Sequence, residues 1–214
     1  MTALEQFLHA RLAQDLPGPE VQLRFAPRPL LKGWRPELSP AGARQAAALI
    51  LIYPGAAGPT MPLTVRRDDL PHHPGQISLP GGRVDPGERP DDAALREAEE
   101  EIGVDRQRIR LIGRLSSLWV VVSNHVVQPF VGIADERPVF RPSPREVASL
   151  LEVPVSSVGD SARLGWSEKA RQGIMVTYPH FEFDGHHVWG ATAMILGEFG
   201  EVLKGTDLFS TDSA

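Results

Sequence analysis

The carboxylates of residues 97–101 are the first group whose residue type and spacing could do chemistry. On a helix, at about 100° per residue, Glu97, Glu100 and Glu101 share one arc, whereas Glu99 points elsewhere. Carboxylates at this spacing repel one another, and Arg96 lies only at the edge of their arc. Two interpretations stay open: a solvated acidic face, or a site at which Mg²⁺ or Mn²⁺ takes oxygen ligands from the grouped carboxylates.

A glycine-rich loop precedes these carboxylates. The segment Pro80-Gly81-Gly82 ends a predicted strand, and residues 85–87 (Asp-Pro-Gly) predict a tight turn before the helix. Paired glycines let a ligand or metal approach the backbone closely, and loop–helix units of this kind commonly receive phosphates. An acidic helix repels phosphate unless cations lie between the two. Loop, helix and metal together therefore predict a site for a phosphoric anhydride.

The helix that carries the carboxylates is predicted over residues 90–102. Pro90 suits a first helical turn, Asp91 and Asp92 complement the positive helix N-terminus, and Gly103 is typical of a C-terminal stop. The apolar stripe that we expect to be buried is a separate arc formed by Ala94, Leu95, Ala98 and Ile102.

The other elements predict an α+β fold around a mixed sheet. Strands are expected at 46–53, where a continuous apolar run indicates burial on both faces, and at 62–66, 76–79, 109–118 and 126–133. An Asp-Gly turn at 184–185 predicts a hairpin over 181–189. Helices are expected over 3–14 and 191–203, and the proline- and arginine-rich segment 15–44 is expected to have little regular structure. Strands outnumber helices without alternating regularly with them, which favours a mixed-sheet sandwich over a doubly wound parallel sheet.

Composition excludes several classes of protein. The chain has 214 residues, a net charge of −5 and a pI near 5.8, so a general nucleic-acid-binding surface is not expected. It has no cysteine, which excludes disulfides, thiolate metal sites and cysteine nucleophiles. Neither a membrane-spanning run nor a signal peptide is predicted, and the expected location is the cytoplasm.

The spacing of the fixed residues between Gly82 and Val104 resembles the complete Nudix box. Gly82 is followed after five residues by Glu88, and after seven more by the run Arg96-Glu97-Ala98-Glu99-Glu100-Glu101-Ile102-Gly103-Val104. The resemblance implies an α/β/α sandwich around a mixed sheet and hydrolysis of a nucleoside diphosphate linked to another group. It also implies that Glu97, Glu100 and Glu101 hold Mg²⁺ or Mn²⁺.

The same resemblance implies roles for four further residues. The Gly81 carbonyl is an expected additional metal ligand, and Gly82 is expected to contact substrate together with Gly81. Arg96 would orient the metal ligands through ion pairs, and Glu88 would support the loop. The general base is left open between Glu97 and a glutamate outside the box.

The stretch before the box is similar to the second signature of Nudix coenzyme A pyrophosphatases. Leu63-Thr64, Arg66, Gly75 and Pro80-Gly81-Gly82 match it at the right spacing, and residues 146–155 and 188–193 resemble later segments of that subgroup. The implied reaction is hydrolysis of coenzyme A, or of its acyl or oxidised forms, to 3′,5′-ADP and 4′-phosphopantetheine or its acyl form. Arg66 and Arg83 are the candidate cations for the substrate phosphates.

Two alternatives remain at this point. One is a Nudix hydrolase of another substrate, such as ADP-ribose, NADH or a nucleoside triphosphate, and the other is a Nudix-fold binding module without turnover. The expected partner is a small nucleoside-diphosphate molecule rather than nucleic acid or a membrane, and a homodimer is left open. The expected organisation is an N-terminal helix and connector over 1–44, a Nudix domain over 45–204 and a polar tail over 205–214.

Overall fold

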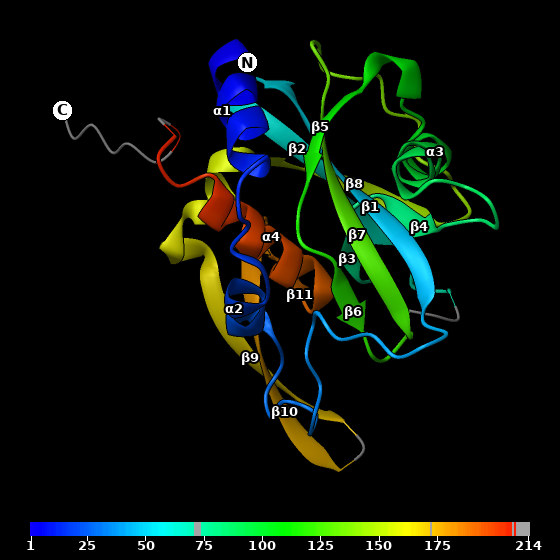
Figure 1. Ribbon diagram of the computed structural model, residues 1–214, viewed down its shortest axis with the longest axis vertical. Coiled ribbons are helices and arrows are strands. Elements are labelled where there is room, and N and C mark those ends of the chain that lie inside the picture. Colours follow the sequence, from blue (N-terminus) through cyan, green and yellow to red (C-terminus); the bar gives the residue numbers. More distant parts are fainter. Residues whose placement is uncertain (71–73, 172, 207, 209–214) are drawn as a thin grey trace.

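The structure is a computed structural model that describes residues 1–70, 74–171, 173–206 and 208 (Figure 1). Its helices are α1 (Thr2–Leu12), α2 (Gly18–Gln22), α3 (Pro90–Ile102) and α4 (Ala191–Val202), with 3₁₀ turns at Leu23–Phe25, Arg106–Arg108, Val155–Gly159 and Ser161–Arg163. Its strands are β1 (Arg44–Gly55), β2 (Gly58–Arg66), β3 (Ile77–Ser78), β4 (Gly81–Arg83), β5 (Arg110–Arg114), β6 (Leu118–Val120), β7 (His125–Ile133), β8 (Val147–Pro154), β9 (Leu164–Arg171), β10 (Ile174–Phe183) and β11 (His186–Trp189).

The strands form a large mixed sheet and a small antiparallel one. In the described part of the chain the large sheet follows the path β3-β2-β1-β7-β5, with β4 paired to β1, β6 to β7 and β8 to β2. Strands β1 and β7 are parallel, and the other pairs are antiparallel. The small sheet has the order β11-β10-β9. The large sheet is therefore mixed, as the sequence predicts.

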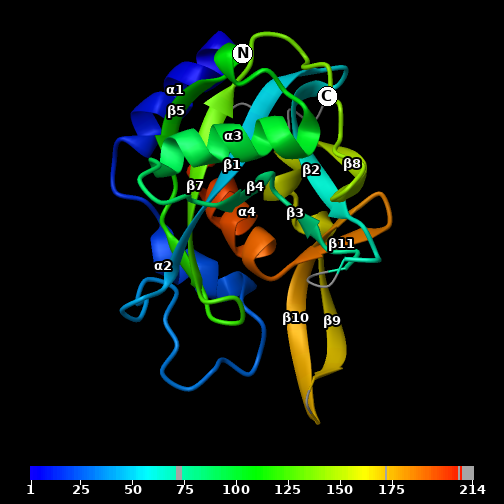
Figure 2. The ribbon, with the colours of Figure 1, turned by 90° about the vertical axis from the view of Figure 1, so that its right-hand side faces the viewer.

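Helices cover both faces of the large sheet, which confirms the predicted sandwich. Figure 1 shows α3 on one side and α1 and α4 on the other, and Figure 2 shows α3 lying across the sheet. One apolar cluster fills the layer under α3 and includes Ala47, Leu49, Ala98 and Ile102. The other joins the opposite face of the sheet to α1, α4 and the small sheet. Residues 47–53 of β1 alternate between these two clusters. All residues of 46–53 are buried, as predicted for a strand covered on both faces.

Most predicted elements are present with small shifts in their ends. The helix predicted over 90–102 has those bounds, and the hairpin predicted over 181–189 turns at Asp184 and Gly185, which both have positive φ. Helix α1 places Leu4, Leu8 and Leu12 in the core, in agreement with the predicted apolar face. The domain boundaries at 44/45 and 204/205 stay predictions, and most of the predicted tail lies outside the described residues.

Several segments differ from the sequence-based expectation. Gly81 and Gly82, predicted as a loop, form strand β4 with Arg83 because they pair with β1, and the single strand predicted over 109–118 is divided into β5 and β6. The connector 15–44 contains helix α2 and a 3₁₀ turn, because contacts with α4 bury Val21 and Gln22 and hold this short helix in place. Strands β8 and β9 and the first half of β10 were not predicted, since their exposed and mixed-polarity residues have no clear period. Within the described residues, the structure contains no helix with the length and apolar character needed to span a bilayer.

Candidate metal centre

Helix α3 and the β4 strand place the predicted carboxylates. Ala94, Ala98 and Ile102 are fully buried against β1 and set the rotation of the helix. Gly103 ends the helix with a φ of 70°, the left-handed conformation typical of a C-terminal glycine. This rotation directs Glu97 and Glu101 toward β4, while Glu100 stays on the exposed side with 60% of its side-chain surface accessible.

Arg96 lies at the centre of an ion-pair network, although helical angles place it only at the edge of the acidic arc. Its Nε and Nη2 bind the two carboxylate oxygens of Glu88 at 2.8 and 2.9 Å, and its Nη1 lies 2.9 Å from Glu97 Oε1. The same Nη1 reaches Glu100 at 3.4 Å, and Nη2 also donates to the Arg83 carbonyl at 2.9 Å. The long arginine side chain spans from the edge of the arc to its members, a reach that helical angles alone do not show.

Glu88 ties the loop to the helix. Its Oε2 accepts the Asp85 N–H at 2.9 Å in addition to the Arg96 bonds, so one carboxylate fixes the turn that precedes α3. The hydrogen bonds from Arg96 lower the pKa of Glu88 to about 2. Glu88 is therefore ionised and fully engaged with protein donors.

Glu101 is buried, so the interpretation of the arc as a solvated acidic face does not describe this residue. The residue is 5% exposed, and its Oε2 accepts the Gly81 N–H at 3.0 Å. Helical angles place it directly beside the apolar stripe, and the side-chain-free glycines of β4 let its carboxylate reach under the helix. Arg66 Nη1 lies 3.9 Å from Glu101 Oε1.

Neighbouring atoms lie so close to Gly81 and Gly82 that a side chain at either position would overlap them. A Cβ on Gly81 would overlap the Ala47 carbonyl, and a Cβ on Gly82 would overlap the Glu97 carboxylate. The glycine pair therefore permits both the pairing of β4 with β1 and the position of Glu97. The Gly81 carbonyl as a ligand, and both glycines as substrate contacts, stay predictions.

The electrostatics of Glu97 and Glu101 differ from those of an ordinary surface pair. Burial raises the pKa of Glu101 to about 7, and repulsion from Glu146 and Glu97 adds to the effect. Burial also raises the pKa of Glu97, partly offset by Arg96. The fold thus holds two carboxylates together at a cost that a bound cation would remove.

Glu146 is a carboxylate of this site to which sequence reasoning gave no role. It precedes β8, is exposed, and acts on both Glu97 and Glu101 through charge repulsion. The pairing of β8 with β2 at Arg66↔Val147, with the Arg67 N–H bound to the Glu146 carbonyl at 3.1 Å, holds Glu146 beside the end of β2 that carries Arg66. The signal that could have identified it was its place in the segment resembling the coenzyme A subgroup, at Glu146-Val147.

The two predicted substrate-binding arginines have different positions. Arg66 ends β2, faces Glu101, and has a buried Nε without a hydrogen-bond partner among the described residues. Arg83 is exposed and follows Gly82 on β4, so its side chain projects from the face opposite to the one that Glu97 contacts. The structure brings Arg66, and not the Arg83 side chain, to the carboxylates.

The residues present fit a hard divalent cation. Glu97, Glu100 and Glu101 offer carboxylate oxygens, the donor type that Mg²⁺ and Mn²⁺ prefer. Among the described residues, Glu101 accepts one hydrogen bond and has one more distant cation, which leaves lone pairs available to an ion.

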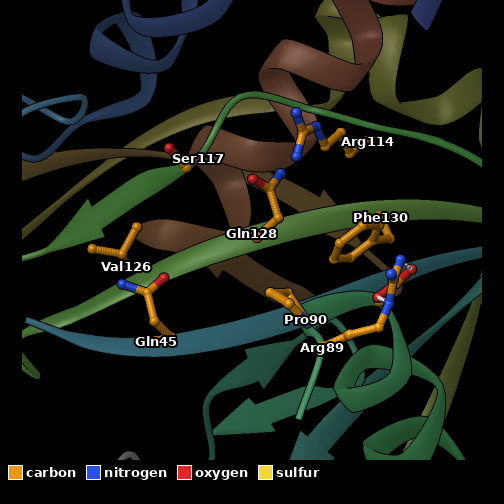
Figure 3. A pocket seen from close by; sticks show the side chains of 9 residues that line it. Gln45, Arg89, Pro90, Arg114, Ser117, Val126, Gln128 and Phe130 are labelled. Carbon is orange, nitrogen blue, oxygen red and sulfur yellow. Dashed lines mark hydrogen bonds and ion pairs between the residues drawn. The ribbon is translucent and has the colours of Figure 1, made fainter. Parts of the chain in front are cut away.

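A separate pocket of about 430 Å³ lies beside the N-terminus of α3 (Figure 3). Its walls come from β1, β7, the β5–β6 segment and the start of α3, and are formed by Gln45, Arg89, Pro90, Asp91, Arg114, Ser117, Val126, Gln128 and Phe130. None of the residues named above as site residues lines it, so this pocket is distinct from the carboxylate site.

Comparison with known proteins agrees with the geometry of the loop and helix. The family model described as the NUDIX domain matches residues 43–170. A protein described as an uncharacterized Nudix hydrolase, NudL, from Photorhabdus laumondii is 32% identical over 159 residues, which are 74% of this chain and 84% of the relative. The protein of the same description from Yersinia enterocolitica is 34% identical over 157 residues, 73% of this chain and 80% of its own.

A solved structure is also similar. The Nudix hydrolase RenU from M. smegmatis has 26% sequence identity and a TM-score of 0.47, over 55% of this chain and 74% of that one. The family match covers more than half of the chain, and its span includes the whole glycine loop, α3 and Arg66. The family match and the two NudL relatives show that the chain belongs to the Nudix hydrolase family.

Proposed function

We propose that the chain hydrolyses the pyrophosphate bond of coenzyme A, or of its acyl or oxidised derivatives, with Mg²⁺ or Mn²⁺. The products are 3′,5′-ADP and 4′-phosphopantetheine or its acylated form. The observation that carries this proposal is the convergence of Glu97, Glu101 and Arg66 at Gly81-Gly82. Negative ligands for a cation and a positive side chain for a phosphate thereby lie side by side.

Glu97, Glu100 and Glu101 would hold the cation in this proposal. When bound, it supplies a water of lowered pKa and neutralises charge on the phosphate oxygens. Arg96 fixes the Glu97 carboxylate, and Glu88 fixes Arg96, so the ligand geometry is set before substrate arrives.

Proton transfer requires a carboxylate near the attacking water. Glu97 and Glu146 are the two candidates that the structure offers for the general base: Glu97 has a raised pKa, and Glu146 is exposed and lies outside the helix. A carboxylate oxygen of either residue would accept the proton of the attacking water. Gln replacement of each, compared over the pH–rate profile, distinguishes them.

Arg66 is the proposed phosphate ligand. Its Nε has no hydrogen-bond partner in the described part of the chain, and its nearest carboxylate is 3.9 Å away, so guanidinium donors remain for substrate oxygens. The backbone N–H of Arg66 donates to the backbone carbonyl of Gln76 at 2.9 Å. This bond joins the two halves of the segment that resembles the coenzyme A signature.

The decisive experiment compares coenzyme A with dephospho-coenzyme A, which lacks the 3′-phosphate. If Arg66 pairs with the 3′-phosphate, a substrate without that phosphate loses about 1.5–3 kcal/mol of transition-state stabilisation, or roughly ten- to a hundredfold in kcat/KM. Arg66→Ala is expected to erase this preference. Arg83→Ala, whose side chain projects from the other face of β4, tests the second predicted arginine and is expected to retain more of it.

The outcomes test separately the substrate, the presence of turnover and the role of Arg66. A wild-type enzyme that prefers ADP-ribose, NADH or a nucleoside triphosphate, with no turnover of coenzyme A or its acyl forms, overturns the substrate assignment. Absence of turnover with every substrate in Mg²⁺ and in Mn²⁺ would instead favour the binding module. An unchanged preference in Arg66→Ala would remove Arg66 from 3′-phosphate recognition.

A further inference from the structure

The β10–β11 hairpin carries a second group of metal-ligating side chains, on the three-stranded sheet. His180 and Glu182 lie two residues apart on β10, and His187 of β11 is the cross-strand partner of Glu182. Alternate residues of a strand, and residues paired directly across strands, project from the same face. One ligand atom from each of these three side chains lies within 4.8 Å of the other two.

His180 is the fixed member of this group. It is 4% exposed, its Nδ1 lies 3.4 Å from the Ser167 hydroxyl, and its ring lies over Gly165 of β9. A Cβ at Gly165 would lie 2.6 Å from His180 Nε2, so the glycine leaves the space that this edge of the ring occupies.

His187 and Glu182 are the adjustable members. The His187 ring stacks on the His180 ring with centroids 3.9 Å apart, and both His187 and Glu182 are exposed. Exposed side chains can turn toward an ion beside the fixed ring without disturbing the core.

We propose that His180, Glu182 and His187 form a binding site for a transition-metal dication of the Zn²⁺ type. Two imidazoles and a carboxylate suit Zn²⁺, which binds nitrogen at about 2.0–2.1 Å and commonly keeps a fourth position for water. The small ligand spacing allows this geometry after inward rotation of Glu182 and His187. The all-oxygen carboxylates of α3 suit Mg²⁺ or Mn²⁺ instead, so the chain has two sites with different metal preferences.

The position of this site gives the ion a structural effect. Strand β11 leads into α4, and the Thr192 hydroxyl at the start of α4 donates to the Ile77 carbonyl of β3 at 3.2 Å. An ion that joins β10 to β11 therefore braces the hairpin that supports α4. Its binding is expected to raise the melting temperature.

The test is calorimetric titration of the tag-free protein with Zn²⁺ in excess Mg²⁺. A Glu97→Gln/Glu101→Gln background removes the α3 carboxylates as a competing Zn²⁺ site. We expect one Zn²⁺ per chain, with affinity reduced at least tenfold by His187→Ala and by Glu182→Gln. The matched control is His186→Ala, because His186 adjoins His187 but projects from the other face of β11.

Each result has a definite meaning. Retention of binding in His186→Ala with loss in His187→Ala supports the site. A Zn²⁺-induced rise in melting temperature that disappears in His187→Ala but persists in His186→Ala supports it independently. Equal losses in both histidine variants, or no saturable Zn²⁺ binding in excess Mg²⁺, would overturn the proposal. His180→Ala is not used alone, because loss of a buried ring could unfold the hairpin.

Discussion

Two glutamates of this chain are almost equally buried but have very different hydrogen-bond partners. Glu198 of α4 is fully buried and accepts three bonds, from the Gly18 N–H at 3.2 Å, the Ser116 N–H at 3.1 Å and Gln22 Nε2 at 2.7 Å. Glu101 of α3 is 5% exposed and accepts one bond, from the Gly81 N–H at 3.0 Å.

The difference separates a structural carboxylate from one available to a ligand. Buried charges persist where the fold supplies donors, and Glu198 has donors from three separate segments of the chain. Glu101 has a single donor, an arginine at 3.9 Å and two repelling neighbours, Glu97 and Glu146. Burial alone therefore says little about function, whereas burial with a deficit of donors indicates where a cation fits.

The largest expected effect is on catalysis. Glu97→Gln and Glu101→Gln should each lower kcat by on the order of 10²–10⁴, because a lost ligand misplaces the cation and its water. Steady-state kinetics in Mg²⁺ and Mn²⁺ measures this, with circular dichroism to verify folding. Near-normal turnover in both variants would contradict the metal-site assignment.

The second expected effect is on stability, at the other glutamate. Glu198→Ala leaves the Gly18 and Ser116 N–H groups without an acceptor and removes one of the two acceptors of Gln22 Nε2, and we expect a loss of about 3–5 kcal/mol in the free energy of unfolding. Urea denaturation measures it, and Glu201→Ala, one turn along the same helix, is the control. If Glu198→Ala lowers the free energy of unfolding no more than Glu201→Ala does, Glu198 is not a structural carboxylate and its contrast with Glu101 fails.

The third effect is a pH dependence of the metal-free protein. Because the folded-state pKa of Glu101 is about 7, against an ordinary value of 4.5, the folded state keeps a proton that the unfolded state releases. The contribution to stability is complete below about pH 4.5 and is lost as the pH rises to about 7, by at most about 3 kcal/mol. When the free energy of unfolding is measured against pH in the presence of a metal chelator, Glu101→Gln should lack this dependence. The same slope in the variant would show that another group causes it.

The smallest effect is stabilisation by Mg²⁺ without substrate. An ion that binds only the folded chain at ten times its Kd adds about 1.4 kcal/mol, and the melting temperature should rise accordingly. The rise should diminish at acid pH, as the glutamates protonate, and be absent in Glu97→Gln/Glu101→Gln. Thermal scans measure it, and an equal rise in the double variant would place the Mg²⁺ site elsewhere.

Local patterns were sufficient to predict the helix that carries the candidate site, but not β4, whose Gly81 and Gly82 were expected in a loop. Pro90 and Gly103 bound α3 where they were expected to, and the apolar run 46–53 forms the doubly buried centre of β1. These predictions succeed because caps, turns and apolar periods act over a few residues. The Nudix family followed from the spacing of fixed residues in one loop and one helix.

The rest depended on contacts between distant residues. The burial of Glu101 comes from β4, 20 residues earlier in the chain, and the short helix α2 depends on Glu198. Arg66 was predicted to serve the substrate, but its distance from Glu101 could be known only once β2 and α3 were placed. No local period reports such distances, so the elements were predicted and several of their side-chain environments were not.

The role of α4 in the core has a consequence for dissecting the chain. The family match ends at residue 170, yet Ile195, Leu196 and Phe199 of α4 pack in the same apolar cluster as Ile50 and Ile52 of β1. A fragment cut at the family boundary would expose one whole face of the central strand and leave it prone to aggregation. During synthesis the same face stays uncovered until residues 191–202 have emerged from the ribosome, so this layer of the core cannot pack before α4 has been made.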